Sequence, residues 1–248
     1  MIIHYNSTKS ENDATELAAR LSQSYSVRCE IVKADLSVDG APESFVEDIK
    51  ARLQDVNGSF MVDILINNAG MVHNADLGEV TVADFLKVYR INALAPLMLT
   101  QAVMPYLPTD RSGRIVNVSS VSSQTGFTDQ SIYGGSKAAL ESCTRSWARQ
   151  LVERCTVNAI NPGPVKTEMW GGLEDSFYKM MNPYIKLAPT MAVRDDDDDE
   201  TKEVGKTLGG RPAEAREIAG IIGMLCSAES AWCTGQVICA NGGMRMSD

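Results

Sequence analysis

Histidine is scarce in this chain of 248 residues, which limits the chemistry available to it. His4 and His73 are the only two histidines, and neither lies near a serine turn or a second candidate metal ligand. A Ser-His-Asp hydrolase and a histidine-rich metal centre are therefore poorly supported, and no metal site is predicted. The six cysteines include no C-x-x-C pair, so we expect reduced thiols rather than a disulfide framework or a zinc site.

Long apolar runs and an excess of positive charge are also absent. No hydrophobic stretch reaches the roughly 20 residues that a membrane-spanning helix needs. The formal charge of −9 argues against nucleic acid or an anionic membrane as a main partner. The opening segment 1–5 is too short for a signal-peptide core and has no basic flank, so we expect a cytoplasmic protein.

What the sequence does contain is an alternation of short β-branched runs and amphipathic helical stretches. This order is typical of an α/β domain whose parallel sheet is covered by helices on both faces. We expect a single doubly wound, Rossmann-like domain over residues 1–248 with a mostly parallel sheet. The predicted strands are 1–5, 28–33, 61–66, 114–118, 156–160 and 236–240. The predicted helices are 11–23, 42–53, 81–107 with a bend at Pro96, 130–153 and 213–226.

Ser120, Tyr133 and Lys137 form the most informative pattern. Tyr133 and Lys137 are four residues apart, so a helix places them on one face. A lysine ammonium one helical turn away favours the phenolate form of tyrosine. We therefore expect Lys137 to lower the pKa of Tyr133 below the reference of about 10. A tyrosine tuned in this way can exchange a proton with the carbonyl or carbinol oxygen of a substrate. Ser120 closes a strand-like run, so its hydroxyl can reach that same oxygen. The set predicts an acid–base tyrosine, a lysine that tunes it and a serine that orients the reacting oxygen. A second such pair, Tyr5 and Lys9, has no preceding serine strand and is interpreted as coincidence.

Polar segments directly follow several predicted strands. Residues 67–70 follow one strand, Ser120 the next, and residues 162–167 the one after that. Because open parallel sheets bind ligands at the carboxyl ends of their strands, we expect these groups to meet at one edge. Structural interpretations stay open, since asparagines such as Asn67 and Asn68 bond backbone in turns and Pro-Gly pairs turn the chain in many folds.

Taken together, these pieces resemble the short-chain dehydrogenase/reductase family over nearly the whole length of the chain. The matching segments are Asn67-Asn68-Ala69-Gly70, Asn92 within residues 90–93, the Ser120/Tyr133/Lys137 set, Asn161-Pro162-Gly163 with Thr167, and residues 234–243. The resemblance implies hydride transfer between a nicotinamide cofactor and a small-molecule carbonyl or secondary alcohol. It also implies a homodimer or homotetramer formed through the helices at 82–107 and 130–153.

The resemblance implies catalytic roles for four residues. Tyr133 is the general acid in carbonyl reduction and the base in alcohol oxidation. Lys137 holds the nicotinamide ribose hydroxyls and tunes Tyr133, while Ser120 bonds the reacting oxygen. Asn92 completes a proton path through water to Lys137. By itself, Asn92 could instead be a helix-bend residue that satisfies backbone groups.

The resemblance also implies the cofactor contacts. Asp35 and Leu36 follow the second strand of this chain and would contact the adenine, although Asp35 could be a plain turn residue. The contacts with the adenosine ribose and the nicotinamide end are Asn68, Ala69, Gly70, Tyr133, Lys137, Pro162, Gly163, Val165 and Thr167. The turn after the first strand, with Asn6 and Ser7, has no acid to hold a ribose 2′-hydroxyl and carries Lys9. NADP(H) is therefore favoured over NAD(H), with an ordinary polar turn as the alternative.

The family begins with a strand, a glycine-rich turn and a helix, and this sequence shows none of them. Met1 falls where the second strand of the family begins, so we expect the first βα unit to be absent. The pyrophosphate-binding turn and the central strand would be lost with it, which predicts a weakened sheet and poor nucleotide affinity. A truncated sequence is the simpler interpretation. A catalytically silent member that acts through protein association is the alternative to an active reductase.

Residues 168–210 take the place of the substrate lid of the family, and we expect them to be irregular. The acidic run 194–200 is expected to stay solvated and flexible, with a metal or cationic-substrate contact as the alternative. Five large side chains of this segment could form an apolar substrate wall or simply pack the lid. They are Trp170, Phe177, Tyr178, Met180 and Met181.

Overall fold

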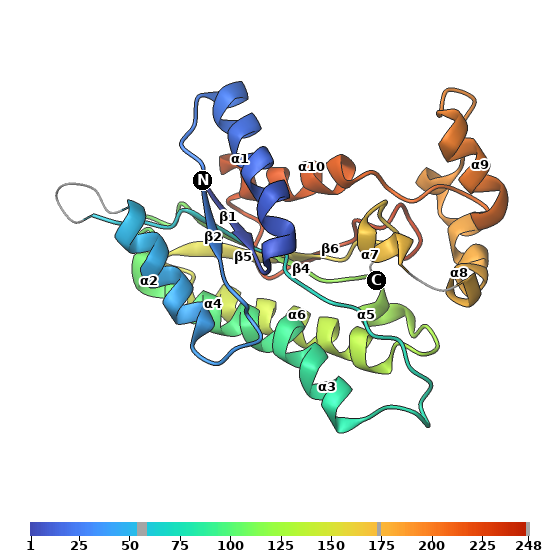
Figure 1. Ribbon diagram of the computed structural model, residues 1–248, viewed down its shortest axis with the longest axis horizontal. Coiled ribbons are helices and arrows are strands. Elements are labelled where there is room, and N and C mark those ends of the chain that lie inside the picture. Colours follow the sequence, from blue (N-terminus) through green and yellow to red (C-terminus); the bar gives the residue numbers. More distant parts are fainter. Residues whose placement is uncertain (54–58, 173–174, 247–248) are drawn as a thin grey trace.

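Parallel strands run through the middle of the molecule in this computed structural model, which describes residues 1–53, 59–172 and 175–246 (Figure 1). The strands are β1 (Ile2–Tyr5), β2 (Glu30–Lys33), β3 (Ile64–Asn67), β4 (Gly113–Val118), β5 (Cys155–Ile160) and β6 (Val237–Ile238). The longer helices are α1 (Glu11–Tyr25), α2 (Ala41–Leu53), α3 (Val82–Tyr89), α4 (Ala95–Val103), α6 (Ser131–Gln150), α8 (Asp175–Leu187), α9 (Asp199–Leu208) and α10 (Ala215–Cys226). Two single-turn helices are α5 (Ser122–Thr125) and α7 (Glu168–Gly171).

Helices cover both faces of the strands, as predicted. In Figure 1, α1 and α10 lie on one side and α2, α4 and α6 on the other. The core between α4, α6 and the strands is apolar and includes Leu99, Val103, Ile115, Leu140 and Val157. All six cysteines are unpaired. In the part of the chain that the structure describes, no helix is long and apolar enough to cross a membrane.

The strands form two parallel sheets rather than the one predicted. β1 pairs with β2, and a second sheet has the order β3-β4-β5-β6. Among the described strands, β1 and β3 therefore pair on one side only. Ile64 and Ile66 point to the same face of β3, since side chains alternate along a strand. They are 47% and 45% exposed, so this part of the sheet lacks cover.

The helix predicted over 81–107 is divided by a wide turn. Thr81 caps its start by accepting a hydrogen bond from the backbone N–H of Asp84 at 3.1 Å. A π-helical turn, Arg90–Leu94, then separates α3 from α4. Pro96 has no N–H to offer the carbonyl of Asn92 four residues earlier, which favours this looser turn. The distortion thus lies one turn before the predicted bend, and it contains the fully buried Asn92.

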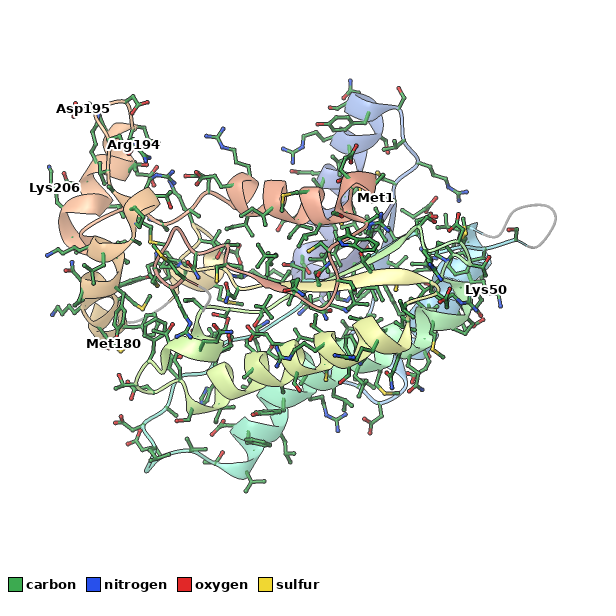
Figure 2. All side chains as sticks on the ribbon, turned by 180° about the vertical axis from the view of Figure 1, so that it is seen from behind. Met1, Lys50, Met180, Arg194, Asp195 and Lys206 are labelled. Atoms are coloured by element: carbon green, nitrogen blue, oxygen red, sulfur yellow. The ribbon has the colours of Figure 1, made fainter. Side chains whose placement is uncertain are left out.

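The lid region is helical, and the prediction of an irregular segment is wrong. α7, α8 and α9 occupy it, and Figure 2 shows Arg194, Asp195 and Lys206 near Met180 at the end of the molecule away from Lys50. The end of the acidic run enters α9, because Asp198 is the N-cap residue and Asp199 and Glu200 lie in the first turn. The Asp198 carboxylate accepts a hydrogen bond from the Thr201 backbone N–H at 2.7 Å. Acids are favourable at a helix N-terminus, where the peptide dipoles leave partial positive charge.

Candidate active site

A cavity of about 610 Å³ opens beyond the carboxyl ends of β3, β4 and β5. This volume lies within the range of small-molecule sites. Its lining contains most of the residues that the sequence places at the site. These are Asn68, Ala69, Gly70, Ser120, Tyr133, Lys137, Pro162, Gly163, Val165 and Thr167. Asn67 does not line it and instead joins β3 to β4, because its amide donates to Asn117 Oδ1 at 2.8 Å.

Tyr133 lies in the first turn of α6, and its neighbouring glycines let that turn pack closely. A Cβ on Gly134 would lie 2.6 Å from the backbone oxygen of Ser122. A Cβ on Gly135 would lie 2.7 Å from the hydroxyl of Tyr89. Both distances are shorter than van der Waals contact, so larger residues would push α6 away. Gly134 therefore lets α6 pack against the turn that carries Ser120, and Gly135 lets it pack against Tyr89 at the end of α3.

The turn that carries Ser120 is held by a buried carboxylate. Ser119 Oγ donates to Glu141 Oε1 at 2.7 Å, and Ser123 Oγ donates to the same oxygen at 2.6 Å. Sequence reasoning missed Glu141, although it lies one helical turn after Lys137 and hence on the same face of α6. Its position fixes the loop on both sides of the candidate orienting serine.

The pKa of Tyr133 is raised, not lowered as predicted. Burial is the larger cause because it penalises the phenolate, and a hydrogen bond with Ser120 opposes it. Lys137 Nζ lies 6.0 Å from the centroid of the Tyr133 ring. The i, i+4 spacing correctly predicted a shared helix face, but burial and the Ser120 hydrogen bond, rather than the ammonium, set the direction of the Tyr133 shift.

Lys137 is a buried cation with a depressed pKa. Its side chain extends from α6 to the end of β4, where Nζ donates to the Val118 carbonyl oxygen at 2.8 Å. Burial lowers its pKa to about 8. A Cβ on Gly70 would lie 3.2 Å from Lys137 Nζ, so the glycine leaves Lys137 accessible from the cavity.

Asn92 is held by backbone groups next to Lys137. Its Nδ2 donates to the Met71 carbonyl at 2.8 Å, and its Oδ1 accepts from the Met71 N–H at 2.9 Å. Nδ2 also lies 3.0 Å from Ser136 Oγ. These bonds match the helix-bend interpretation of Asn92, because they tie the π-helical turn to the loop after β3. Asn92 lies behind Gly70, outside the cavity lining.

The loop after β5 is tied to the lid and to the Ser120 turn. Val121 N–H donates to the Pro162 carbonyl at 2.9 Å. Thr167 caps α7 by accepting from the Trp170 N–H at 3.4 Å. Lys166 forms an ion pair with Glu200 at 3.1 Å, linking this loop to α9. The acidic run thus contacts a lysine of the same chain.

The four N-terminal residues predicted to bind cofactor lie outside the lining of this cavity. Asn6 and Ser7 follow β1, where Asn6 Oδ1 accepts from Ser10 Oγ at 3.3 Å. Asp35 follows β2 and accepts from both the backbone and side chain of Ser37, which lowers the pKa of Asp35. These hydrogen bonds within one turn support the interpretation of Asp35 as a turn residue. Leu36 is 6% exposed and packs in the core.

One wall of the cavity is apolar. Trp170, Phe177 and Met181 line it, as the substrate-wall interpretation requires, together with Phe127 from the loop before α6. Tyr178 and Met180 pack against the same apolar cluster without lining the cavity. Three further polar lining residues, Ser119, Ser122 and Gln130, were not predicted. Gln130 is the N-cap residue of α6, and its position three residues before Tyr133 is the one local signal that pointed to it.

The chain is similar to known oxidoreductases over almost its whole length. The family model described as Enoyl-(Acyl carrier protein) reductase matches residues 1–245. An L-xylo-3-hexulose reductase of Hypocrea jecorina is 44% identical over 270 residues, with 100% of this chain and 88% of the relative covered. An L-xylulose reductase of Aspergillus niger is 41% identical over 266 residues, with 100% and 89% covered.

Solved structures agree with this relationship. A blue fluorescent protein from a metagenomic library, in complex with NADPH, superposes with a TM-score of 0.80 at 28% identity, covering 99% of this chain and 87% of that one. The angucycline C-6 ketoreductase LanV with bound NADP superposes with a TM-score of 0.79 at 28% identity, covering 98% and 84%. Fold and site thus define a nucleotide-dependent oxidoreductase of Rossmann type. The chain belongs to the short-chain dehydrogenase/reductase family.

Proposed function

We propose that the protein reduces the keto group of an open-chain sugar with NADPH, and runs the reverse oxidation of the polyol. The family supports interconversion of a carbonyl and an alcohol, and the two ketose reductases at 44% and 41% identity support the substrate class. The observation that carries the proposal is the convergence of Ser120, Tyr133 and Lys137 on one cavity. That cavity has both an apolar wall and polar side chains, as a sugar carbon chain with hydroxyls requires.

The residues of the chain have distinct tasks in this reaction. Tyr133 donates its phenolic proton to the substrate oxygen during reduction and takes it back during oxidation. Ser120 bonds the same oxygen and, through its bond to Tyr133, holds the phenol in line. Lys137 supplies a positive charge within the buried site. Asn92 positions the Gly70 loop beside Lys137, and its further role in a proton path is part of this proposal.

The cavity fits the nicotinamide end of a dinucleotide, which supplies the hydride when bound. Two glycines of the lining leave room that a larger residue would fill. A Cβ on Gly70 would lie 3.2 Å from Lys137 Nζ, and a Cβ on Gly163 would lie 3.0 Å from Met191 Cε. Asn68 and Ala69 would lie along the ribose, and Val165 and Thr167 along the carboxamide. Pro162 would complete that loop.

NADP(H) is the favoured cofactor, with NAD(H) possible. The turn after β1 holds Asn6, Ser7 and Lys9 without an acid, and Lys33 Nζ donates to Thr8 Oγ1 at 3.2 Å. Two lysines beside hydroxyl groups suit a ribose 2′-phosphate. Asp35 and Leu36 would flank the adenine from the neighbouring turn.

We further propose that the sheet lacks one βα unit of the family. In space, the strand of that unit would lie between β1 and β3 and join the two sheets, and residues 1–248 do not supply it. The family match begins at residue 1 and does not itself support this. The support is the division of the strands into two sheets, together with the exposed Ile64 and Ile66. Nucleotide affinity would be weak without a pyrophosphate-binding turn. Equal hydrogen-exchange protection of β1, β3 and β4 amides would contradict the idea.

We also propose a cytoplasmic homodimer or homotetramer built on α3, α4 and α6. Val82, Leu86 and Leu97 are exposed apolar side chains on α3 and α4 and are suited to an interface. Six unpaired cysteines agree with a reducing compartment. Light scattering on the purified protein tests the assembly, and a monomer at all concentrations would contradict it.

The decisive experiment is NADPH oxidation with L-xylulose by the wild type and by Tyr133→Phe. We expect the variant to lose about 10²- to 10⁴-fold in kcat because it has no proton to donate. Tyr25→Phe, which changes an exposed tyrosine of α1 outside the cavity lining, is the matched control. A folded wild type that binds NADPH without any turnover would instead favour the catalytically silent alternative.

A further inference from the structure

Gln130 is a buried polar side chain in the cavity wall. It precedes α6 as its N-cap residue, is 5% exposed and lines the cavity. Tyr133 follows Gln130 by three residues in the chain, and both line the same cavity. Gln130 thus shares the cavity with the reacting group without being part of the Ser120, Tyr133 and Lys137 set.

The side-chain amide of Gln130 has a hydrogen-bond partner for its nitrogen but not for its oxygen. Its Nε2 donates to Asn74 Oδ1 at 3.2 Å, whereas its Oε1 has no hydrogen-bond partner. Six buried side-chain atoms in the described residues lack a partner, and only that of Gln130 belongs to a side chain lining this cavity. A buried acceptor without a partner costs free energy, so a donor from a ligand would be favourable there.

The chemistry of the site defines which donor this is. A substrate carbonyl oxygen is an acceptor and pairs with the hydroxyls of Ser120 and Tyr133, so it cannot satisfy Gln130. A hydroxyl group on a carbon near the carbonyl is a donor and can. The aromatic rings of Phe127 and Phe177 on the apolar wall can pack the carbon chain itself.

We propose that Gln130 is a specificity residue that accepts a hydrogen bond from a substrate hydroxyl, so that the site prefers hydroxylated ketones over plain ones. This inference rests on the proposed ketone reduction and adds the residue that selects the substrate class. A site built to bond a hydroxyl discriminates against an analogue that lacks it, because the buried acceptor is then left unpaired.

The test compares L-xylulose with 2-pentanone, which has the same carbon skeleton and no hydroxyl groups. Gln130→Met keeps the size of the side chain and removes the acceptor. We expect kcat/KM for L-xylulose to fall about tenfold and kcat/KM for 2-pentanone to stay unchanged. Gln23→Met, the same change at an exposed glutamine of α1, is the matched control and should alter neither. Gln130→Glu retains acceptor oxygens and should retain the preference.

Equal losses with both ketones, or none with either, would overturn the inference. If the wild type oxidises no NADPH, the proposed function fails, but Gln130 is still tested by binding. Titration of L-xylulose against the fluorescence of Trp170 in the cavity wall needs no hydride transfer. A tenfold weaker binding by Gln130→Met supports the inference, and equal or absent binding overturns it. Gln130→Ala replaces the methionine variant should that variant not fold.

Discussion

The carboxyl edge of β4 and β5 and the two-stranded β1–β2 sheet contrast sharply in how firmly they hold their polar groups. β4 and β5 pair over six residues, from Gly113 with Cys155 to Val118 with Ile160, and are almost wholly buried. β1 and β2 pair over four residues and are mostly half-buried. The candidate catalytic groups follow the first pair, and the candidate phosphate-binding groups follow the second.

This difference reflects the work expected of each region. Proton transfer by Tyr133 needs a fixed geometry and a site without bulk water, so its supports, such as Gly134 and Glu141, are buried and closely packed. The proposed recognition of a phosphate by Lys9 would work through charge at an exposed turn and would tolerate looser packing. The two regions should therefore respond differently to substitution.

The largest effect is expected at Gly134. A Cβ there would lie 2.6 Å from the Ser122 carbonyl oxygen, so Gly134→Ala should move α6 and lower the free energy of unfolding by about 1–3 kcal/mol. Turnover should also fall, and by more than the loss of folded protein explains, since Tyr133 moves with α6. Urea unfolding and turnover measure the two. Gly220→Ala, at a helical glycine with nothing within 4 Å, should instead stabilise slightly. Indistinguishable stability of the two variants would contradict the tight-packing argument.

A smaller, pH-dependent effect is expected from Lys137. Burial lowers its pKa to about 8 from an ordinary value of 10.5. Between these values the unfolded chain holds a proton that the folded protein has released, so stability should rise with pH from about 8 to 10. The raised pKa of Tyr133 gives the opposite slope only at higher pH.

Lys137→Met should abolish that rise in stability, as measured by urea unfolding at several pH values. The exposed Lys179→Met is the matched control and should keep the wild-type slope. A rise that persists in Lys137→Met would show that another group is responsible and that Lys137 is hydrated.

The smallest effect on folding is expected in the turn after β1. Lys9→Glu places a negative charge where the 2′-phosphate of NADPH is proposed to bind, so KM for NADPH should increase about tenfold. KM for NADH and the thermal midpoint should not change, because the side chain is exposed. Lys179→Glu, the same reversal on α8, controls for net charge. An equal rise in both KM values would place the phosphate elsewhere.

Much of the fold could be predicted because each strand and helix has its own local pattern. β4 begins at Gly113 and ends at Val118, within one residue of the predicted 114–118. The residues 67–70 and 162–167 were brought to one edge because parallel strands end on the same side. The helix at 130–153 is α6, with Tyr133 and Lys137 on one face as expected.

The failures depended on contacts between distant segments. The lid was expected to be irregular, yet α8 and α9 fold there because Phe177, Met181 and Leu208 share an apolar cluster. The predicted direction of the Tyr133 pKa shift was wrong because burial outweighs the hydrogen bond with Ser120. The unpartnered oxygen of Gln130 was missed because nothing local shows that an amide will be buried with a free acceptor.

The sequence by itself determined the alternation of strands and helices and the identity of the groups that can exchange protons, since both depend on residue type and short-range spacing. Only the tertiary structure decided how those groups are tuned. Desolvation of Tyr133 and Lys137, the unpartnered oxygen of Gln130 and the division between β1 and β3 all depend on which atoms surround a group. That environment comes from segments far apart in the chain, so no local pattern contains it.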